Sequence, residues 1–285
     1  MVAYRFCRSD DIPLLVDGYN RCWRAHFPYD PELDRAGFKR WIRDIQLWTS
    51  SCMVASDDDG PLGVLLGCKR DDATLIWRLA VHPLRQREGH ARHLLTSLSS
   101  KLAILGPPTL KVELPESRPE LDRVFSACGY SVIDKPGPST SADWVLEQTP
   151  LAAPPAMVIP FTVDDLLANH SFDPTIRRSW QRGLPALETQ SGEITGLAVA
   201  SFDGIEAFLL AREGDPDEIV SFGSTEADRA EVNLRTLLAA WIEHHGGRVS
   251  ISRVTDEEVS PELLHELGFR KTETYREWTT TARPA

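Results

Sequence analysis

The sequence lacks an apolar run long enough to cross a membrane. Stretches such as "LIWRLAV" and "GIEAFLLA" are far shorter than the roughly 20 residues that a spanning helix needs. The first residues, "MVAYRFCRSDD", carry acids where a secretory signal would need an apolar segment. Only five cysteines occur, without a C-x-x-C pair or zinc-ligand spacing. We therefore expect a cytosolic protein with reduced thiols, no membrane partner and no metal.

Positive charge is also in short supply. The chain has 31 Lys and Arg against 42 Asp and Glu, a net charge of −11. Residues 1–150 hold 19 basic and 20 acidic side chains, whereas residues 151–285 hold 12 and 22, so the two halves carry −1 and −10. Such a surface repels a phosphate backbone, so we expect no nucleic-acid partner and find a cationic amine more compatible. Alternatively, the excess of acidic side chains serves only to keep the protein surface solvated.

The length and composition are those of a folded protein with room for two domains. The 285 residues are 42% hydrophobic and 26% charged, as in ordinary globular proteins. The segment "EQTPLAAPPAMVIP", residues 147–160, contains four prolines and no amphipathic period. We therefore predict a domain at residues 1–149, a linker at 150–156 and a second domain at 157–285.

The two halves repeat one pattern. Three pairs of landmarks are each 139 residues apart: Gly129 and Gly268, Val81 and Val220, and Leu110 and Val249. Each half presents a strand, two helical segments, an antiparallel strand set, a long helix, a strand, a short helix and a terminal hairpin, which in the first half joins "YSVID" to "DWVLE". The predicted fold class is α+β, with two domains that each have a mixed, mostly antiparallel sheet flanked by helices.

The turn "VHPLRQREGHARH", residues 81–93, connects an apolar strand to a long helix. Such a turn aims backbone N–H groups in one direction, and the helix N-terminus adds about half a positive charge. Gly89 and Ala91 leave room for a large anion, while Arg85, Arg87 and Arg92 can supply charge. The pattern indicates an anion site, although exposed basic residues at an ordinary helix start would read the same way.

This turn resembles the Gln/Arg-x-x-Gly-x-Gly/Ala signature of the GCN5-related N-acetyltransferase (GNAT) family. Gln86, Gly89 and Ala91 occupy the signature positions, and "VHP" precedes them as in the family. The helix end "FSACGY" is similar to a second family feature. The resemblance covers residues 1–150, and the second half is similar in element order alone.

The resemblance implies binding of acetyl-coenzyme A. The pyrophosphate would lie on the backbone of the turn, and the pantetheine arm would pair with the preceding strand where it separates from "LKVEL". The implied contacts are Leu79, Ala80, Val81, Gln86, Arg87, Glu88, Gly89, His90, Ala91 and Arg92. Arg87 and Arg92 would contact phosphate.

The usual catalytic residues of the family are missing. Phe125 stands where the family often has a tyrosine acid, and Leu75 stands where many members have a glutamate base. A base contributes about 10²- to 10⁴-fold in rate because an ammonium must lose a proton before it attacks. By strand alternation Glu113 is the best substitute, with His82 and His90 weaker candidates. An exposed Glu113 without a role in the chemistry is the alternative.

The second half lacks the basic turn. Its counterpart, "VSFGSTEADRAEV", places Asp228 and Ala230 where the first half has Gly89 and Ala91. Carboxylates there would repel a pyrophosphate, so we predict that this half has lost the cofactor. We expect it to have a structural role in an intramolecular pseudo-dimer, within a monomer or a homodimer.

The predicted activity is transfer of acetyl from acetyl-coenzyme A to a primary amine, by direct attack, in the N-terminal domain. The expected acceptor is a small molecule. Acylation of protein lysines or N-termini, and a non-catalytic acyl-coenzyme A sensor, are the alternatives. Trp23, Phe27 and Tyr29 lie where the family builds its acceptor pocket, and packing in the core would explain them equally.

Overall fold

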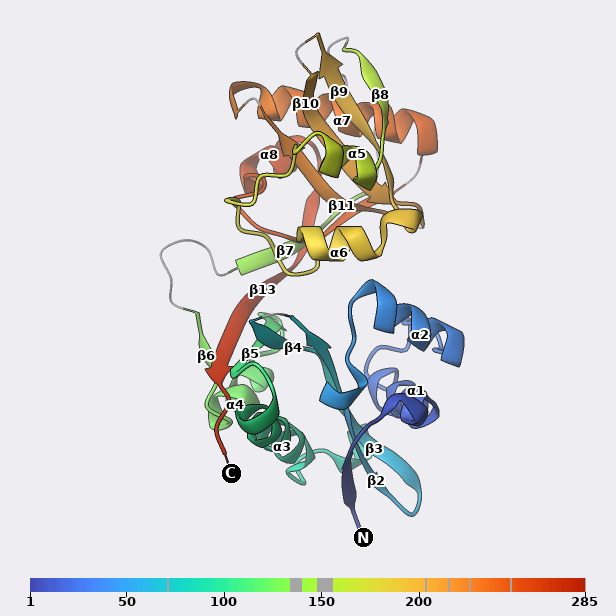
Figure 1. Ribbon diagram of the computed structural model, residues 1–285, viewed down its shortest axis with the longest axis vertical. Helices are drawn as coiled ribbons and strands as arrows, with labels where there is room; N and C mark the ends of the chain where they lie inside the picture. The colour runs from blue at the N-terminus through green and yellow to red at the C-terminus, as the bar shows by residue number, and fades with distance from the viewer. Residues whose placement is uncertain are drawn as a thin grey trace. The chain divides into compact units, whose positions relative to one another are not determined.

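The computed structural model divides into two compact units, coloured along the chain in Figure 1. The first contains Met1–Asp134 and Arg276–Ala285, and the second contains Lys135–Tyr275. The residues described are 1–70, 72–133, 140–147, 156–202, 204–214, 216–225, 227–246 and 248–284.

The first unit is a mixed sheet with helices on its faces. Its strands are β1 (Ala3–Phe6), β2 (Met53–Asp57), β3 (Gly60–Lys69), β4 (Ala73–Val81), β5 (Thr109–Pro115), β6 (Ser131–Val132) and the end of β13 (Arg270–Thr281). Their order is β1-β2-β3-β4-β5-β13, and β6 pairs with β13. The pairs from β1 to β4 are antiparallel, whereas β4 and β5 are parallel. The mixed α+β class is confirmed.

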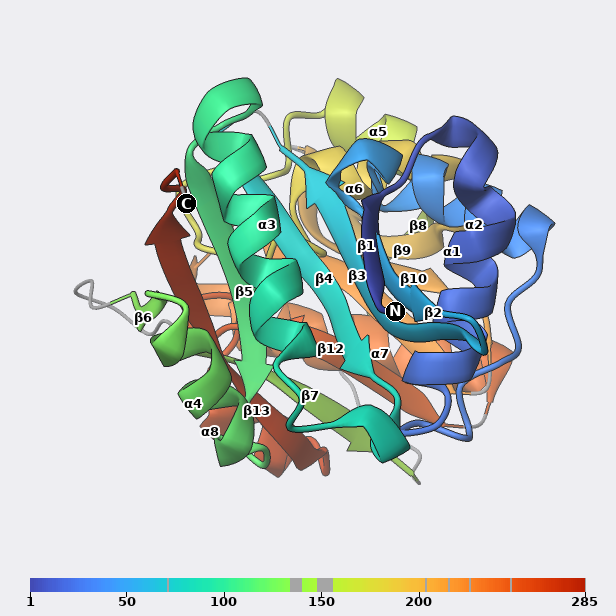
Figure 2. The same cartoon turned by 90° about the horizontal axis from the view of Figure 1, so that it is seen from below.

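The helices of the first unit follow from capping and apolar spacing. They are α1 (Ile12–Gly18), the π-helical turn η2 (Tyr19–Trp23), α2 (Arg35–Asp44), α3 (His90–Leu105) and α4 (Pro119–Ala127). Asp34 caps α2 by accepting from the Gly37 amide. Leu94, Leu98 and Leu102 recur at helical spacing on α3 and are buried against the sheet with Val112. Figure 2 shows α3 lying across β4 and β5.

The second unit repeats this plan. Its strands are β7 (Thr140–Leu146), β8 (Val158–Phe161), β9 (Thr195–Ser201), β10 (Gly204–Arg212), β11 (Asp217–Ser224), β12 (Val249–Val254) and the start of β13. Their order is β8-β9-β10-β11-β12-β7-β13, with β11 and β12 parallel. The helices are α5 (Val163–Ala168), α6 (Leu184–Thr189), α7 (Ala230–His245) and α8 (Pro261–Glu266). Like α3, α7 has 16 residues.

The two halves of the sequence exchange strands, so the expected terminal hairpin in the first half is wrong. The predicted partners belong to different units: β6 pairs with β13, with Trp278 opposite Val132, whereas β7 pairs with β12. Each exchanged strand brings a tryptophan into a core. Trp144 of β7 is buried in the second unit, and Trp278 of β13 is buried in the first. Alternation identifies a strand but not its distant partner, which explains the error.

The compact units do not coincide with the two halves of the sequence. Of the described residues, 140–147 belong to the second unit and 276–284 to the first. Thr279 Oγ1 of the terminal segment donates to the Leu110 carbonyl at 3.0 Å, while Tyr275 OH donates to Asp143 of β7 at 2.9 Å. Apart from residue 156, the expected linker at 150–156 lies outside the described residues.

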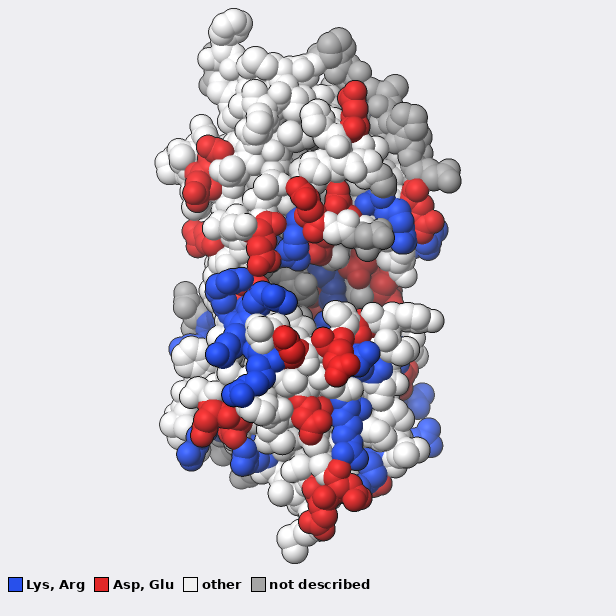
Figure 3. Space-filling model, turned by 90° about the vertical axis from the view of Figure 1, so that its right-hand side faces the viewer, with Lys and Arg blue, Asp and Glu red and all other residues white. Residues whose placement is uncertain are grey.

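Charged side chains of both signs are interspersed on the face drawn in Figure 3. Within the described residues, no helix combines the length and apolar character that crossing a membrane requires. The same part of the chain contains no cluster of three His, Cys, Asp or Glu side chains arranged to hold a metal ion.

Candidate functional site

Strands β4 and β5 pair at one end and then separate. Their register runs from Ala73 opposite Thr109 to Leu75 opposite Lys111 and stops there, although β4 continues to Val81. Because the sheet is unpaired past Leu75, the later part of β4 presents a free backbone edge. This separation was expected at this pair of strands.

The free edge of β4 is formed by Leu79 and Val81. The His82 amide donates to the Leu62 carbonyl of β3 at 2.9 Å, and N–H and C=O groups alternate in direction along an antiparallel strand. The backbone of Ala80 therefore points toward Val64 on β3, and that of its two neighbours points away from it. Of the three strand residues predicted to contact the cofactor, Leu79 and Val81 have the required orientation, and the Val81 carbonyl already accepts from His26 Nε2 at 2.8 Å.

The turn after β4 has an unusual backbone. A short 3-10 segment, Pro83–Arg85, is followed by positive φ angles at Arg87 (65°) and Gly89 (88°). Gly89 is the N-cap of α3, and no described side chain caps this helix. A Cβ built on Gly89 would meet nothing within 4 Å, so open space lies next to the first amides of the helix. Uncapped amides beside open space can bind an anion.

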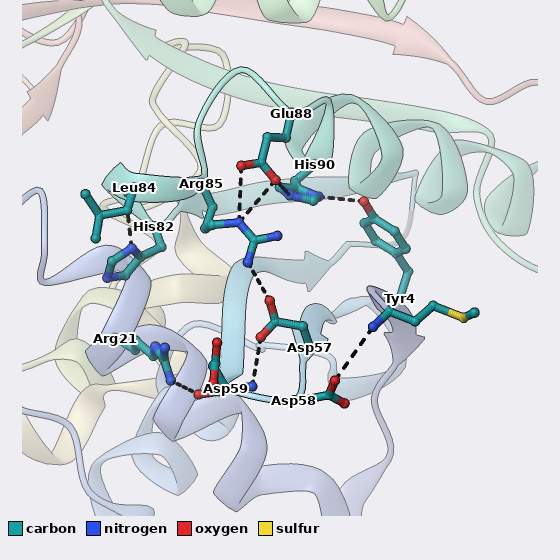
Figure 4. A network of polar contacts seen from close by, with 11 residues as sticks. Tyr4, Arg21, Asp57, Asp58, Asp59, His82, Leu84, Arg85, Glu88 and His90 are labelled. Atoms are coloured by element: carbon teal, nitrogen blue, oxygen red, sulfur yellow. Dashed lines mark hydrogen bonds and ion pairs between the residues drawn. The ribbon is translucent and has the colours of Figure 1, made fainter.

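A polar network fixes the turn to the sheet (Figure 4). Arg85 pairs with Asp57 of β2 and donates from Nε to both oxygens of Glu88, at 3.2 and 3.1 Å. Glu88 lies 3.1 Å from Nε2 of His90, whose Nδ1 is 2.6 Å from Tyr4 OH. One neutral tautomer, with the proton on Nε2, satisfies both contacts of this buried imidazole.

The network leaves two arginines for an anion. The hydrogen bond from Arg85 lowers the pKa of Asp57, and those from His90 and Arg85 lower the pKa of Glu88, so both carboxylates stay charged near neutral pH. Arg85 is consequently occupied, contrary to our expectation that it could serve a phosphate. Arg87 and Arg92 are exposed, and neither pairs with another side chain in the described ranges. His90 can contribute its backbone, since its side chain is buried.

The predicted base lies on the sheet face opposite α3. Leu110, Val112 and Leu114 of β5 are buried with α3 and α4, so Lys111 and Glu113 point to the other face. Lys111 Nζ is 3.5 Å from Glu277 of β13 on that face. His82 Nδ1 accepts from the Leu84 amide at 3.4 Å, which gives this side chain a local capping role.

The residues in the usual acid and base positions are packed in the core. Phe125 is 2% exposed and Leu75 is 4% exposed, so neither supplies a proton-transfer group. Phe125 contacts Tyr130 edge to face, with centroids 5.1 Å apart. The Tyr130 hydroxyl is buried and has no hydrogen-bond partner within the described part of the chain. Burial raises the pKa of Tyr130 well above its ordinary value.

Arg78 and Asp30 form a pair that was not predicted from the sequence. A β-bulge on β4 leaves Trp77 unpaired between Ile76, which lies opposite Gly67 of β3, and Arg78, which lies opposite Leu66. Arg78 Nη1 donates to Asp30 Oδ2 and to Tyr19 OH, both at 2.9 Å. The available signal was one arginine inside the apolar strand "TLIWRLAV". Of the expected pocket aromatics, Trp23 joins this cluster and stacks on Phe27, whereas Tyr29 is 99% exposed.

The equivalent turn in the second unit is shorter. Strand β11 continues to Ser224, four residues beyond the repeat landmark Val220, and α7 begins at Ala230. Arg229 therefore takes the N-cap position that Gly89 has in the first unit, and the predicted match of Gly89 to Asp228 is off by one. Arg229 has a φ of −111° and pairs with Glu206 at 2.8 Å, so this turn offers neither the glycine nor a free arginine.

A buried arginine fills the strand separation of the second unit. Strands β11 and β12 pair at Asp217–Val249 and Glu218–Ser250 and then part. Beyond that point Arg182 Nη1 donates to the Ile219 carbonyl of β11 at 2.8 Å and to the Ser252 carbonyl of β12 at 3.3 Å. Its Nε donates to Glu258, whose side chain has no exposed surface. The guanidinium thus occupies the edge that the first unit leaves available.

Comparison with known proteins supports the fold along the whole chain. Residues 12–129 match the model of the Acetyltransferase (GNAT) family. A tandem GNAT protein from the clavulanic acid biosynthesis pathway is 15% identical with a TM-score of 0.72, and the match covers 100% of both chains. A GCN5-related N-acetyltransferase from Sphaerobacter thermophilus is 14% identical with a TM-score of 0.68, covering 100% of this chain and 96% of that one. The chain therefore has the tandem GNAT fold.

Proposed function

We propose that the first unit, in which residues 12–129 match the Acetyltransferase (GNAT) family model, binds acetyl-coenzyme A and acetylates a primary amine of a small molecule. The observation that carries this proposal is the free edge of β4 directly before an uncapped, positively charged turn. In the second unit the corresponding edge is filled and the turn is acidic, so we assign that unit a structural role.

The residues of the first unit fit the cofactor. The backbone of Leu79 and Val81 suits a strand-like arm, because its polar groups point away from β3. The turn offers the amides from Gln86 to Ala91 to a pyrophosphate, with open space beside Gly89. Arg87 and Arg92 supply charge beside these amides. When bound, acetyl-coenzyme A supplies an activated acetyl thioester.

We assign Glu113 the role of general base. An acceptor amine is protonated at neutral pH, and a carboxylate on the face opposite α3 can hold the proton that it loses before direct attack. Lys111 lies on the same face, and its ammonium forms an ion pair with Glu277 of β13. Phe125 and Leu75 are apolar and buried, which supports our assigning this role to another residue.

Calorimetric titration of coenzyme A tests the cofactor site. We expect Gly89→Trp to weaken binding at least about 100-fold, because the indole fills the space beside the amides and removes charge-assisted contacts. Gly246→Trp is a matched control, since Gly246 also has a positive φ and nothing within 4 Å of its Cβ, but lies in the second unit. Equal binding by wild type and Gly89→Trp would show that the site lies elsewhere.

The core packing of Phe125 and Leu75 favours a second candidate, a non-catalytic acyl-coenzyme A sensor. Thiol release measured with a broad amine panel separates the two functions. An enzyme turns over, and Glu113→Gln lowers kcat about 100-fold with unchanged coenzyme A affinity. Tight coenzyme A binding with no turnover across the panel would support the sensor instead.

A further inference from the structure

Arg78 is enclosed by four aromatic rings. Its guanidinium carbon lies 4.4 Å from the Trp77 ring centroid, 4.5 Å from Trp23, and 5.3 Å from both Tyr19 and Trp41. Contacts of this kind hold a guanidinium by cation–π attraction and exclude water from its faces. The Arg78 side chain is 19% exposed, so most of its surface is covered but part remains open.

The two polar edges of this guanidinium differ in their hydrogen bonds. Nη1 donates to both Tyr19 OH and Asp30 Oδ2, and Trp23 Nε1 donates to the same Asp30 oxygen at 2.7 Å. Within the described residues, neither Nε nor Nη2 of Arg78 has a hydrogen-bond partner, and neither atom is buried. One edge of the guanidinium is thus fixed by the protein, whereas the other has no partner in this part of the chain, on a side chain that is 19% exposed.

The open edge lies at the separation of β4 and β5. Arg78 follows the last paired residue of β4, Leu75, by three positions, and precedes Leu79. The bulge turns it to the face of α1, η2 and α2, since its aromatic neighbours Tyr19 and Trp41 come from those segments. This is also the face of Glu113. The Arg78 donors and the proposed base therefore lie on one side of the sheet.

We propose that the Nε and Nη2 donors of Arg78 bind a carboxylate of the acceptor, so that the acceptor is an amino acid or a similar amino-carboxylate. A planar fork with two parallel donors matches a carboxylate, which accepts two hydrogen bonds in one plane. Asp30 and the rings keep the fork in a fixed orientation, so little side-chain entropy is lost on binding. This inference rests on the proposed acetyltransferase function.

The alternative is that Arg78 only braces the aromatic cluster through Asp30. The two roles differ in what they predict for ligands that differ at the carboxylate alone. A brace gives equal affinity for an acid and its amide, whereas a binding fork favours the acid. Trp23 and Trp77, both within 4.5 Å of the guanidinium carbon, make intrinsic fluorescence a direct reporter.

The experiment titrates the intact protein, saturated with coenzyme A, with the twenty common L-amino acids and the matching amino-acid amides. We expect at least one amino acid to bind at least about 10-fold more tightly than its amide, because a charge-assisted bidentate contact is lost in the amide. Arg78→Lys, which keeps the charge but not the fork, should remove most of that preference. Arg21→Lys is the control, since Arg21 is exposed and bonds the Asp59 carbonyl elsewhere in the same unit.

Three outcomes overturn the proposal: equal affinity for every acid and amide pair, no binding of either set, or an acid preference that survives Arg78→Lys. Coenzyme A titration in the same samples keeps the two proposals apart. If coenzyme A binds and no acid preference appears, the carboxylate site is wrong and the cofactor site stands. If coenzyme A itself does not bind, the proposed function fails.

Discussion

The two units share a strand order but differ at the point where their parallel strands part. In the first unit, β4 has no described strand partner on this side at Leu79 and Val81, although the Val81 carbonyl accepts from His26, and an eight-residue turn, 82–89, leads to α3. In the second unit, Arg182 bonds the carbonyls of Ile219 and Ser252 across the gap, and a five-residue turn, 225–229, leads to α7. The two units thus keep one strand order, although a side chain of the protein fills the gap in the second.

The difference also lies in charge. The first turn neutralises its acids internally, since Arg85 holds both Asp57 and Glu88 and leaves Arg87 and Arg92 available. In the second turn Arg229 forms an ion pair with Glu206, and Asp228 is exposed. The first turn is therefore electrostatically more favourable for an anion than the described part of the second.

The largest expected effect comes from giving the first turn the charge of the second. We expect Arg87→Glu with Arg92→Glu to weaken coenzyme A binding about 1,000-fold, since two charge-assisted contacts become repulsions. Calorimetry at fixed ionic strength measures it. The control is Arg229→Glu with Arg235→Glu, which makes the same charge change in the second unit. A similar loss in both double variants would mean that net charge, rather than this turn, controls the affinity.

The basic turn is the part of this site that could be predicted, because its chemistry lies in contiguous residues. Alternation likewise identified the faces of β5 correctly, since Leu110, Val112 and Leu114 are buried. What failed was non-local: the partners of β6 and β7 are separated from them by more than 100 residues, and nothing in their own sequences specifies the pairing.

Two buried or half-buried arginines also could not be predicted from the sequence, because their partners lie far away along the chain. Arg182 meets Glu258, 76 residues away, and its segment "RRSWQRG" has the composition of an exposed loop. Arg78 depends on Asp30, Tyr19 and Trp23, which come from earlier parts of the chain. Charge burial of this kind follows from three-dimensional pairing, and sequence periodicity carries no trace of it.

The second-largest expected effect is a loss of stability in the second unit. Arg182→Met removes the partner of the fully buried Glu258, and we expect the free energy of unfolding to fall by about 3 kcal/mol. Arg178, 3.7 Å from the same carboxylate, limits the loss. Urea denaturation measures it, with Arg212→Met as a control because Arg212 is partly exposed in its pair with Glu218.

The same variant sharpens the functional contrast. Folded Arg182→Met should bind one equivalent of coenzyme A with unchanged affinity, because emptying the gap does not restore the basic turn. Two bound equivalents would show that Arg182 alone had closed the second site. Unchanged stability would show that the buried pair contributes nothing to the unit.

The smallest expected effect is at the pair Tyr130 and Phe269, which follow Gly129 and Gly268 in the two units. Both rings are buried, but only Tyr130 carries a hydroxyl, and no group in the described part of the chain bonds it. Because a buried unsatisfied donor costs about 1–3 kcal/mol, we expect Tyr130→Phe to raise the free energy of unfolding by about 1 kcal/mol.

Burial raises the pKa of Tyr130, so the native state keeps the phenol neutral while the unfolded chain ionises near pH 10. Wild type therefore loses stability as pH rises past about 10, and the advantage of the variant should be constant below that pH and widen above it. Urea denaturation between pH 7 and pH 10.5 measures the difference, with Phe269→Tyr as the reciprocal change, expected to destabilise the second unit. If Tyr130→Phe instead slows acetyl transfer without a gain in stability, the hydroxyl meets the reacting groups, and the first unit retains a proton donor that the second has lost.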